Sequence, residues 1–300
     1  MSAAIRIGGF TESEVSDVLA HACRLVDLDP VGAKMLRGHT NAVFSLTSAP
    51  VVAKIARRGT PLESVRSTVR LVEWLMRQDF PTVRLLPVEQ PVVVPTGQAV
   101  TFWEYLPQVE QPVPAAAIAR PLKQLHQLPA PPFEIRPLDT VGAIRRSLAV
   151  ITALPRDDIA YLRDRLEGLE KALADVVFAL PPGLLQGDPQ HRNALHHPNG
   201  AVLCDWDTAC SGAPEMDLVT VEIHCRRFGY GRAHYEAFAS SYGFDVTAWP
   251  GYGVLRDLRE LRMITTNAKR AVVGTRTLAE VTARVEGLRR EDHELRWNIL

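Results

Sequence analysis

Three oxygen-bearing side chains near the middle of the chain have a spacing that suits phosphoryl transfer. Asp188 is followed five residues later by Asn193, and Asp205 comes directly after the apolar run Ala201–Cys204, which is typical of a strand. Phosphoryl transfer needs a carboxylate that orients and deprotonates the attacking hydroxyl, and oxygen ligands that hold Mg²⁺ against a triphosphate. Loops at strand ends would present these groups together.

The wider segment resembles the phosphotransferase signature of the aminoglycoside phosphotransferase family, whose small-molecule kinases share the protein-kinase fold. The pattern GDxxxxN begins at Gly187, DWD begins at Asp205, and a GAP tripeptide follows at Gly212. A turn and a strand-end asparagine would explain the first pattern alone, but not all three in this order with a strand between them. The chain departs from the family at Gln186, where histidine is usual; glutamine can still hydrogen-bond the loop backbone.

The resemblance implies a role for each acidic or amide residue of the segment. Asp188 is expected to be the catalytic base, and Asn193 and Asp205 are expected to be ligands of Mg²⁺. Asp217 resembles the buried aspartate that braces the catalytic loop through backbone N–H groups. Asp207 is expected to assist the metal or the substrate.

Lys54 lies in the apolar run Val51–Ile55 and resembles the kinase lysine that contacts the α- and β-phosphates of the nucleotide. A lysine on the solvent face of a strand is the alternative, but the catalytic segment follows in the expected order. The loop 37–44 falls where a phosphate-covering loop is required, although it has one glycine instead of GxGxxG. Thr40 and Asn41 are its candidate phosphate contacts.

The resemblance also points to further nucleotide contacts. In protein kinases a helix glutamate holds the strand lysine, but here Thr68 occupies that position, so Glu63 is our substitute. An ordinary surface charge is the alternative for Glu63. The segment 101–107 resembles the linker whose backbone groups bind the adenine edge, with Glu104 and Leu106 as candidates. A plain edge strand remains the alternative for this segment.

The elements that must position these residues change in type along the chain. Thr11 and Glu14 have the spacing of a capping box, which predicts an opening helix. Short β-rich runs follow as far as Tyr105, interrupted by a helix over Leu62–Gln78. We expect strands over these runs: Ala42–Thr47, Val51–Ile55, Val92–Val94 and Ala99–Trp103.

The chain beyond the proline-rich segment Gln108–Pro114 has mainly helical patterns. The exception is 184–205, where Asn199-Gly200 favours a type I′ hairpin. We expect helices over Ala115–Leu128, Asp157–Leu180, Pro214–Phe228, Arg232–Tyr242, Gly253–Val273 and Leu278–Arg296. The prediction is an α+β fold: a small antiparallel-sheet nucleotide-binding lobe over 1–106 and a larger, mostly helical catalytic and substrate-binding lobe over 107–300.

The composition excludes several classes of partner. The 34 basic and 34 acidic residues balance, so no global field favours nucleic acid or an anionic membrane. The four cysteines form no CxxC pair and are expected to be free thiols, and no apolar run approaches the length of a membrane span. We therefore expect a cytoplasmic protein. We also expect it to be a monomer or a homodimer.

These patterns favour a kinase that transfers the γ-phosphate of ATP or GTP, with Mg²⁺, to a hydroxyl of a small molecule. Residues 215–300 contain 12 acidic and 13 Lys or Arg residues, so no acidic excess is present to attract a polycationic aminoglycoside. A less cationic antibiotic, sugar or other metabolite is the expected acceptor. The alternative is a catalytically weak nucleotide-binding pseudokinase that acts as a regulatory partner; Gln186 and the missing helix glutamate motivate it.

Overall fold

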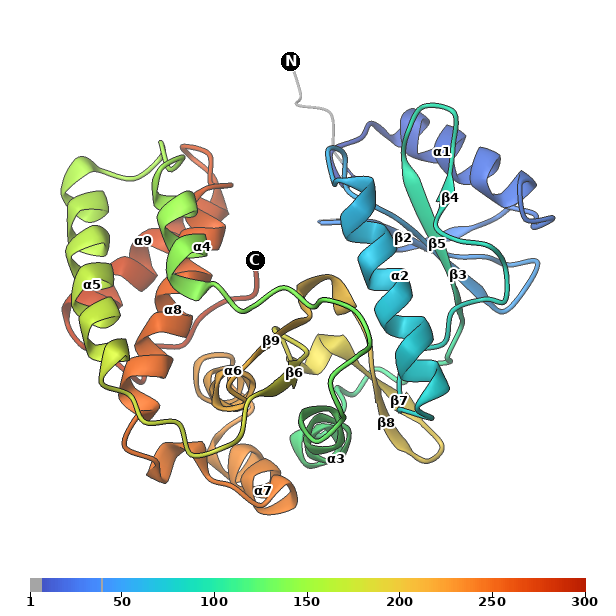
Figure 1. The fold of residues 1–300 in the computed structure, drawn as a ribbon. Coiled ribbons are helices and arrows are strands. Elements are labelled where there is room, and N and C mark those ends of the chain that lie inside the picture. The colour runs from blue at the N-terminus through green and yellow to red at the C-terminus, as the bar shows by residue number, and fades with distance from the viewer. Residues whose placement is uncertain (1–6, 39) are drawn as a thin grey trace. The chain divides into compact units, whose positions relative to one another are not determined.

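An antiparallel sheet of five strands forms the centre of the first of two compact units. The computed structural model describes residues 7–38 and 40–300. The first unit takes in the described residues up to Gln111 together with Leu195–Asp207. The strands lie in the order β1-β2-β3-β5-β4 (Figure 1). Their bounds are Lys34–Arg37 (β1), Ala42–Ser45 (β2), Val51–Ile55 (β3), Val92–Val93 (β4) and Ala99–Glu104 (β5).

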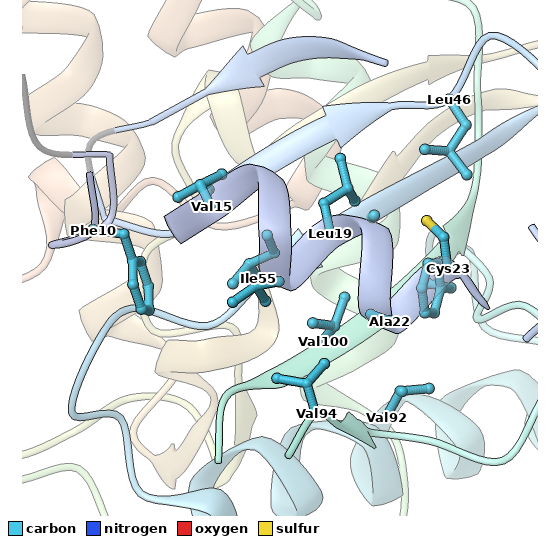
Figure 2. Packing of buried hydrophobic residues seen from close by; sticks show 14 of the residues in the cluster. Phe10, Val15, Leu19, Ala22, Cys23, Leu46, Ile55, Val92, Val94 and Val100 are labelled. Carbon is cyan, nitrogen blue, oxygen red and sulfur yellow. The ribbon is translucent and has the colours of Figure 1, made fainter. Parts of the chain in front are cut away.

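Helix α1 (Glu12–Arg24) covers one face of this sheet. Thr11 caps the helix: its side chain accepts from the N–H of Glu14, and the Glu14 carboxylate accepts from the N–H of Thr11. The predicted capping box is therefore confirmed. The apolar side of α1 packs against strand residues such as Ile55 and Val100, as Figure 2 shows.

The packing of α1 decides which way Lys54 points. Val51, Ala53 and Ile55 are buried in the cluster beneath α1. Because successive side chains of a strand point to opposite faces, Lys54 lies on the other face of the sheet. Helix α2 (Leu62–Arg77) contributes residues to the surroundings of Lys54 on that face.

A hairpin from later in the sequence completes the first unit. It consists of β7 (Ala194–His197) and β8 (Gly200–Leu203). Leu203 donates its N–H to the carbonyl of Pro81 and accepts from the N–H of Val83, at 3.0 and 3.1 Å. These backbone bonds attach the end of β8 to the segment that follows α2, and Asp205 comes two residues later.

The second unit, Pro112–Ala194 with Thr208–Leu300, is mainly helical. Helix α8 (Tyr252–Ala268) lies at its centre and contacts α4, α5, α6 and α9. An apolar core joins α4, α5, α8 and α9. The other helices are α3 (Ala115–His126), α4 (Thr140–Leu148), α5 (Arg156–Ala174), α6 (Glu215–Arg227), α7 (Arg232–Tyr242) and α9 (Arg276–Arg289).

One short strand pair leads to the predicted catalytic loop. β6 (Gly183–Leu185) pairs antiparallel with β9 (Cys210–Gly212). The chain then passes through Gln186–Gln190 into the 3₁₀ turn η1 (His191–Asn193). The short turns η2 (Trp206–Thr208) and η3 (Val246–Ala248) complete the elements of the described residues.

The predicted α+β organisation is confirmed: the N-terminal part is built on an antiparallel sheet, and most of the remaining chain is helical. The division at residues 106 and 107 stays a prediction. Among the described residues, no helix combines the length and the apolar character that spanning a membrane requires.

Candidate active site

Lys54 is the cation of a polar cluster on the sheet face opposite α1. Its Nζ lies 2.9 Å from Asp205 Oδ1 and 2.8 Å from Asp207 Oδ2, and its side chain is 15% exposed. Burial lowers the pKa of the Lys54 amine, but the two carboxylates outweigh burial and hold the pKa above its usual value. The amine is therefore charged at neutral pH, as a phosphate-binding lysine must be.

Trp206 anchors the segment that carries both carboxylates. Its ring is buried and lies edge-on to Phe80, with centroids 5.8 Å apart, and its Nε1 donates to Thr82 Oγ1 at 2.8 Å. Asp205, just before it, has a φ of 58°, a left-handed conformation that costs a non-glycine residue roughly 1–3 kcal/mol. We attribute the retention of that conformation to the fixed position of Trp206.

Asn41 and Thr40, the candidate phosphate contacts, lie near Lys54, and their role in phosphate binding stays a prediction. Asn41 donates from Nδ2 to Asp207 Oδ2 at 2.9 Å and accepts at Oδ1 from the N–H of Arg57 at 3.0 Å. Both residues line a cavity of about 210 Å³ together with Lys54. His39, in the same predicted phosphate-covering loop, lies outside the described residues.

Glu63 and Thr68 occupy different surroundings on α2. The Glu63 carboxylate lies 3.8 Å from Arg66 and from Arg70, and its side chain is 67% exposed. Thr68, by contrast, lines the cavity that contains Lys54. The pairing of Glu63 with Lys54 stays a prediction that this geometry does not favour, because Lys54 already has two aspartates as partners.

The two candidates for adenine contacts lie at the end of β5 and just beyond it. The carboxylate of Glu104 is half-exposed and lies 3.8 Å from Arg84 Nε. The carbonyl of Leu106 accepts from the side chain of Gln108 at 3.2 Å. Their roles in nucleotide binding stay predictions.

Gly187 sets the conformation of the loop after β6. Its φ is 83°, and a Cβ atom at this position would lie 2.3 Å from the carbonyl oxygen of Thr208. Glycine is therefore required for both backbone angle and space. Gln186, the departure from the family pattern, is fully buried and accepts at Oε1 from the N–H of Asp188 at 2.7 Å.

Asp188 receives hydrogen bonds at both carboxylate oxygens. Oδ2 accepts from Gln190 Nε2 at 2.7 Å and from Asn193 Nδ2 at 3.3 Å. The same Asn193 amide also donates to the backbone carbonyl of Asp188 at 2.9 Å. The predicted base and the predicted metal ligand of this loop therefore contact each other directly.

Arg259 is the second partner of Asp188, and the sequence analysis missed it. Its Nη2 lies 2.5 Å from Asp188 Oδ1, and its Nη1 donates to the carbonyl of Gly187 at 3.2 Å. No sequence motif marks it, because Arg256 and Arg262 lie one helical turn away on either side in α8. Only the fold brings this one arginine to the predicted catalytic loop.

Asp217 holds the same loop from the first turn of α6. It is almost fully buried and accepts from the backbone N–H groups of Gln186 and Gly187, at 2.8 and 3.0 Å. His126 Nε2 lies 3.2 Å from it, and Tyr242 bonds the other ring nitrogen of His126 at 2.8 Å. This is the bracing geometry that the resemblance implied.

A cavity of about 430 Å³ opens beside Asp188 within the second unit. Gln190 and Arg259 also line it, as does His224, whose pKa burial lowers to about 4 even though Asp188 opposes the shift. A neutral His224 and a hydrogen-bonded carboxylate therefore stand at one wall of a space that is large enough for a small molecule.

The carboxylates near Lys54 suit magnesium only in combination with other oxygen ligands. In the part of the chain that the structure describes, no three His, Cys, Asp or Glu side chains gather closely enough to hold a metal ion alone. Mg²⁺ is usually bound by one or two carboxylates together with substrate phosphates. Asp205 and Asp207 supply such a pair, so the residues fit a magnesium ion that arrives with a nucleotide.

Solved structures of small-molecule kinases resemble this chain in fold. The choline kinase LicA from Streptococcus pneumoniae is 16% identical with a TM-score of 0.69, and the match covers 92% of this chain and 99% of that one. An amicoumacin kinase is 13% identical with a TM-score of 0.69, and the match covers 96% of this chain and 98% of that one. An aminoglycoside phosphotransferase from Streptomyces rimosus is 20% identical with a TM-score of 0.55, and the match covers 82% of this chain and 98% of that one. The predicted protein-kinase-like fold is confirmed.

The sequence itself supplies the assignment to a family. No curated protein matches the chain. The model of the phosphotransferase enzyme family matches residues 34–258, which include Lys54 and the whole segment from Gly187 to Asp217. Because this match spans well over half of the sequence, the chain belongs to the phosphotransferase enzyme family.

Proposed function

We propose that this chain transfers the γ-phosphoryl group of ATP or GTP to a hydroxyl group of a small molecule. The observation that carries the proposal is the setting of Asp188. Its loop is held by Asp217 and shaped by Gly187, and its carboxylate opens on a cavity that can accept a small molecule. Membership of a phosphotransferase family supports the proposal that this carboxylate takes part in phosphoryl transfer.

Four residues of the two clusters have a defined task in the proposed reaction: Lys54, Asp188, Asn193 and Asp205. Lys54 binds the nucleotide phosphates, and Asp205 and Asn193 provide oxygen ligands for Mg²⁺, which would neutralise charge on the triphosphate. Asp188 orients the acceptor hydroxyl. The bond from the γ-phosphorus to its bridging oxygen breaks, a bond to the hydroxyl oxygen forms, and Asp188 takes the hydroxyl proton.

The nucleotide part of the proposal has support from the second cluster and from one similar structure. Lys54 is charged, and the cavity it lines also contains Thr40 and Asn41 from the predicted phosphate-covering loop. The amicoumacin kinase of similar fold was solved with AMP-PNP and Ca²⁺. We propose that the present chain binds its nucleotide triphosphate in the same way, with Mg²⁺.

The substitution Asp188→Asn tests the catalytic role most directly. Asparagine keeps the size of the side chain but cannot take the hydroxyl proton, so kcat should fall about 10²- to 10⁴-fold. Affinity for Mg²⁺ and AMP-PNP, measured by calorimetry, should stay within about twofold because the change acts on the transition state. Release of ADP or GDP, followed across a panel of hydroxyl compounds, gives the rate.

Asp164→Asn, an exposed aspartate of α5, is the matched control and should leave the rate unchanged. Turnover at the wild-type rate by Asp188→Asn would refute the role of Asp188. Nucleotide binding without acceptor-stimulated release in the wild type would instead favour the pseudokinase.

A further inference from the structure

The cavity beside Asp188 is lined by more positive than negative side chains. Five arginines line it, against two aspartates. The arginines are Arg136, Arg146, Arg259, Arg262 and Arg284, and the aspartates are Asp139 and Asp188. A polycationic acceptor would meet repulsion in such a cavity, whereas an anion would be attracted.

Two of the arginines are already neutralised by the two aspartates. Arg146 pairs with Asp139 at 2.9 Å, and Arg259 pairs with Asp188 at 2.5 Å. Arg284, almost fully buried, pairs with Glu280 behind the wall. Arg262 differs from these three arginines in its hydrogen-bond partners.

Arg262 has only neutral partners in the described structure. Its Nη1 donates to Thr266 Oγ1 at 2.6 Å and lies 3.4 Å from Ser147 Oγ. Burial lowers the pKa of the Arg262 guanidinium, and the positive charges of Arg259, Arg146 and Arg270 lower it further, while the charge of Asp139 opposes the shift. An arginine nevertheless stays protonated, so the cavity wall carries a charge that no described carboxylate contacts.

Two buried N–H groups of the same lining also lack hydrogen-bond acceptors among the described residues. They are Nε of Arg259 and Nη1 of Arg284. A buried donor without a partner is costly, and such groups commonly mark a place where an unseen ligand or water binds. Arg259 lies one helical turn from Arg262, on the same side of α8.

We propose that the acceptor of this phosphotransferase carries an anionic group, a phosphate or a carboxylate, and that Arg262 is the residue that selects it. The inference rests on the proposed function and adds the charge class of the substrate to it. The guanidinium matches a multi-oxygen anion in geometry as well as in charge. Arg136 lines the same cavity, and its Nε donates to the carbonyl of Ala209 at 3.2 Å.

The first experiment uses inorganic phosphate and does not depend on turnover. Calorimetry with the full chain, saturated with Mg²⁺ and AMP-PNP, should show phosphate binding that weakens about 10- to 100-fold in Arg262→Gln. Arg163→Gln removes the same charge from the exposed side of α5 and should change the affinity less than twofold. Absent phosphate binding, or equal binding by both variants, would overturn the proposal.

Saturation with AMP-PNP also shows whether the added phosphate binds at the acceptor position or at the position of a nucleotide phosphate. Phosphate that binds only when AMP-PNP is absent occupies the position of a nucleotide phosphate. The same holds if Arg262→Gln lowers the affinity for phosphate and the affinity for AMP-PNP by the same factor. Either result overturns the assignment of Arg262 to the acceptor.

A second experiment compares acceptors that share one scaffold. Glucose 6-phosphate should stimulate nucleoside diphosphate release at least tenfold more than glucose or glucosamine, measured as kcat/KM, and Arg262→Gln should remove that preference. Preference for glucosamine would overturn the anion proposal while it supports the kinase function. Phosphate binding through Arg262 without stimulated release by any acceptor would leave the anion site standing and count against the proposed function.

Discussion

Gly187 cannot be replaced without disturbing the loop that carries Asp188. Gly187→Ala would place Cβ 2.3 Å from the carbonyl oxygen of Thr208 in a backbone with a φ of 83°. We expect the free energy of unfolding to fall by about 2–4 kcal/mol, the sum of a left-handed alanine and a backbone shift. Urea unfolding followed by circular dichroism measures the change.

Gly274→Ala separates these two contributions. Gly274 has a φ of 80° and lies in the same unit, but a Cβ at this position would have no neighbouring atom within 4 Å. This variant should therefore lose only about 1–2 kcal/mol, the cost of the backbone conformation. Equal losses in the two variants would show that the contact with Thr208 is unimportant.

Residue types and spacing indicated the chemistry of the site, but not all of its members. Asp188, Asn193, Asp205 and Asp217 follow one signature within thirty residues, so their likeness to a family could be read directly. Arg259 lies 71 residues after Asp188, in a helix with arginines at three-residue spacing. Its contact with Asp188 depends on the packing of α8, which no local pattern encodes.

At the scale of elements, the first turn of α6 holds the loop after β6 that carries Asp188. The Asp217 carboxylate accepts from two backbone N–H groups and contacts His126. Asp217→Asn keeps the shape but turns one acceptor into a donor, which leaves a buried N–H without a partner at a cost of about 1–3 kcal/mol. Both kcat and the free energy of unfolding should fall.

The control for this change is Asp175→Asn at the C-cap of α5, which is exposed and should affect neither quantity. Stability is measured by urea unfolding, and kcat by nucleoside diphosphate release. A variant Asp217→Asn that keeps wild-type stability and turnover would show that the loop holds its conformation without α6.

Most helices and strands matched their patterns, but several predicted helices end earlier in the structure; the predicted helix Gly253–Val273, for example, ends at Ala268. The predicted helix Asp157–Leu180 ends at Ala174, and in the segment beyond it Glu215 accepts from the N–H groups of Ala179 and Leu180 at 2.7 and 2.8 Å. The predicted helix to Arg296 ends at Arg289, and Arg227 binds the carbonyls of the segment beyond it. Both interactions join residues far apart in sequence.

One helix was missed, and one turn type was predicted wrongly. Helix α4 (Thr140–Leu148) was not predicted, although Asp139 caps it by accepting from the N–H of Gly142. Its nine residues, with a glycine in the first turn, give a weak helical pattern. The hairpin between β7 and β8 is present, but it is not type I′, since Gly200 takes a positive φ and Asn199 does not.

At the scale of the whole molecule, two buried histidines should make the protein sensitive to acid. Burial lowers the pKa of His191 to about 3, helped by the charge of His234, and burial lowers the pKa of His224 to about 4. Both are close to 6.5 in an unfolded chain. Below pH 6.5 the unfolded state therefore binds up to two more protons than the folded state, and stability falls as pH falls.

Between pH 7 and pH 5 the free energy of unfolding should decrease by about 3–4 kcal/mol, since each histidine contributes about 1.4 kcal/mol per pH unit below its unfolded pKa. Carboxylates whose pKa is lowered in the folded state, such as Glu260, change the free energy of unfolding mainly below pH 5, because their unfolded pKa lies near 4.5. His224→Gln should remove about half of the decrease. His21→Gln on α1, a partly exposed histidine, serves as the matched control. An undiminished decrease in His224→Gln would mean that His224 gains its proton without unfolding.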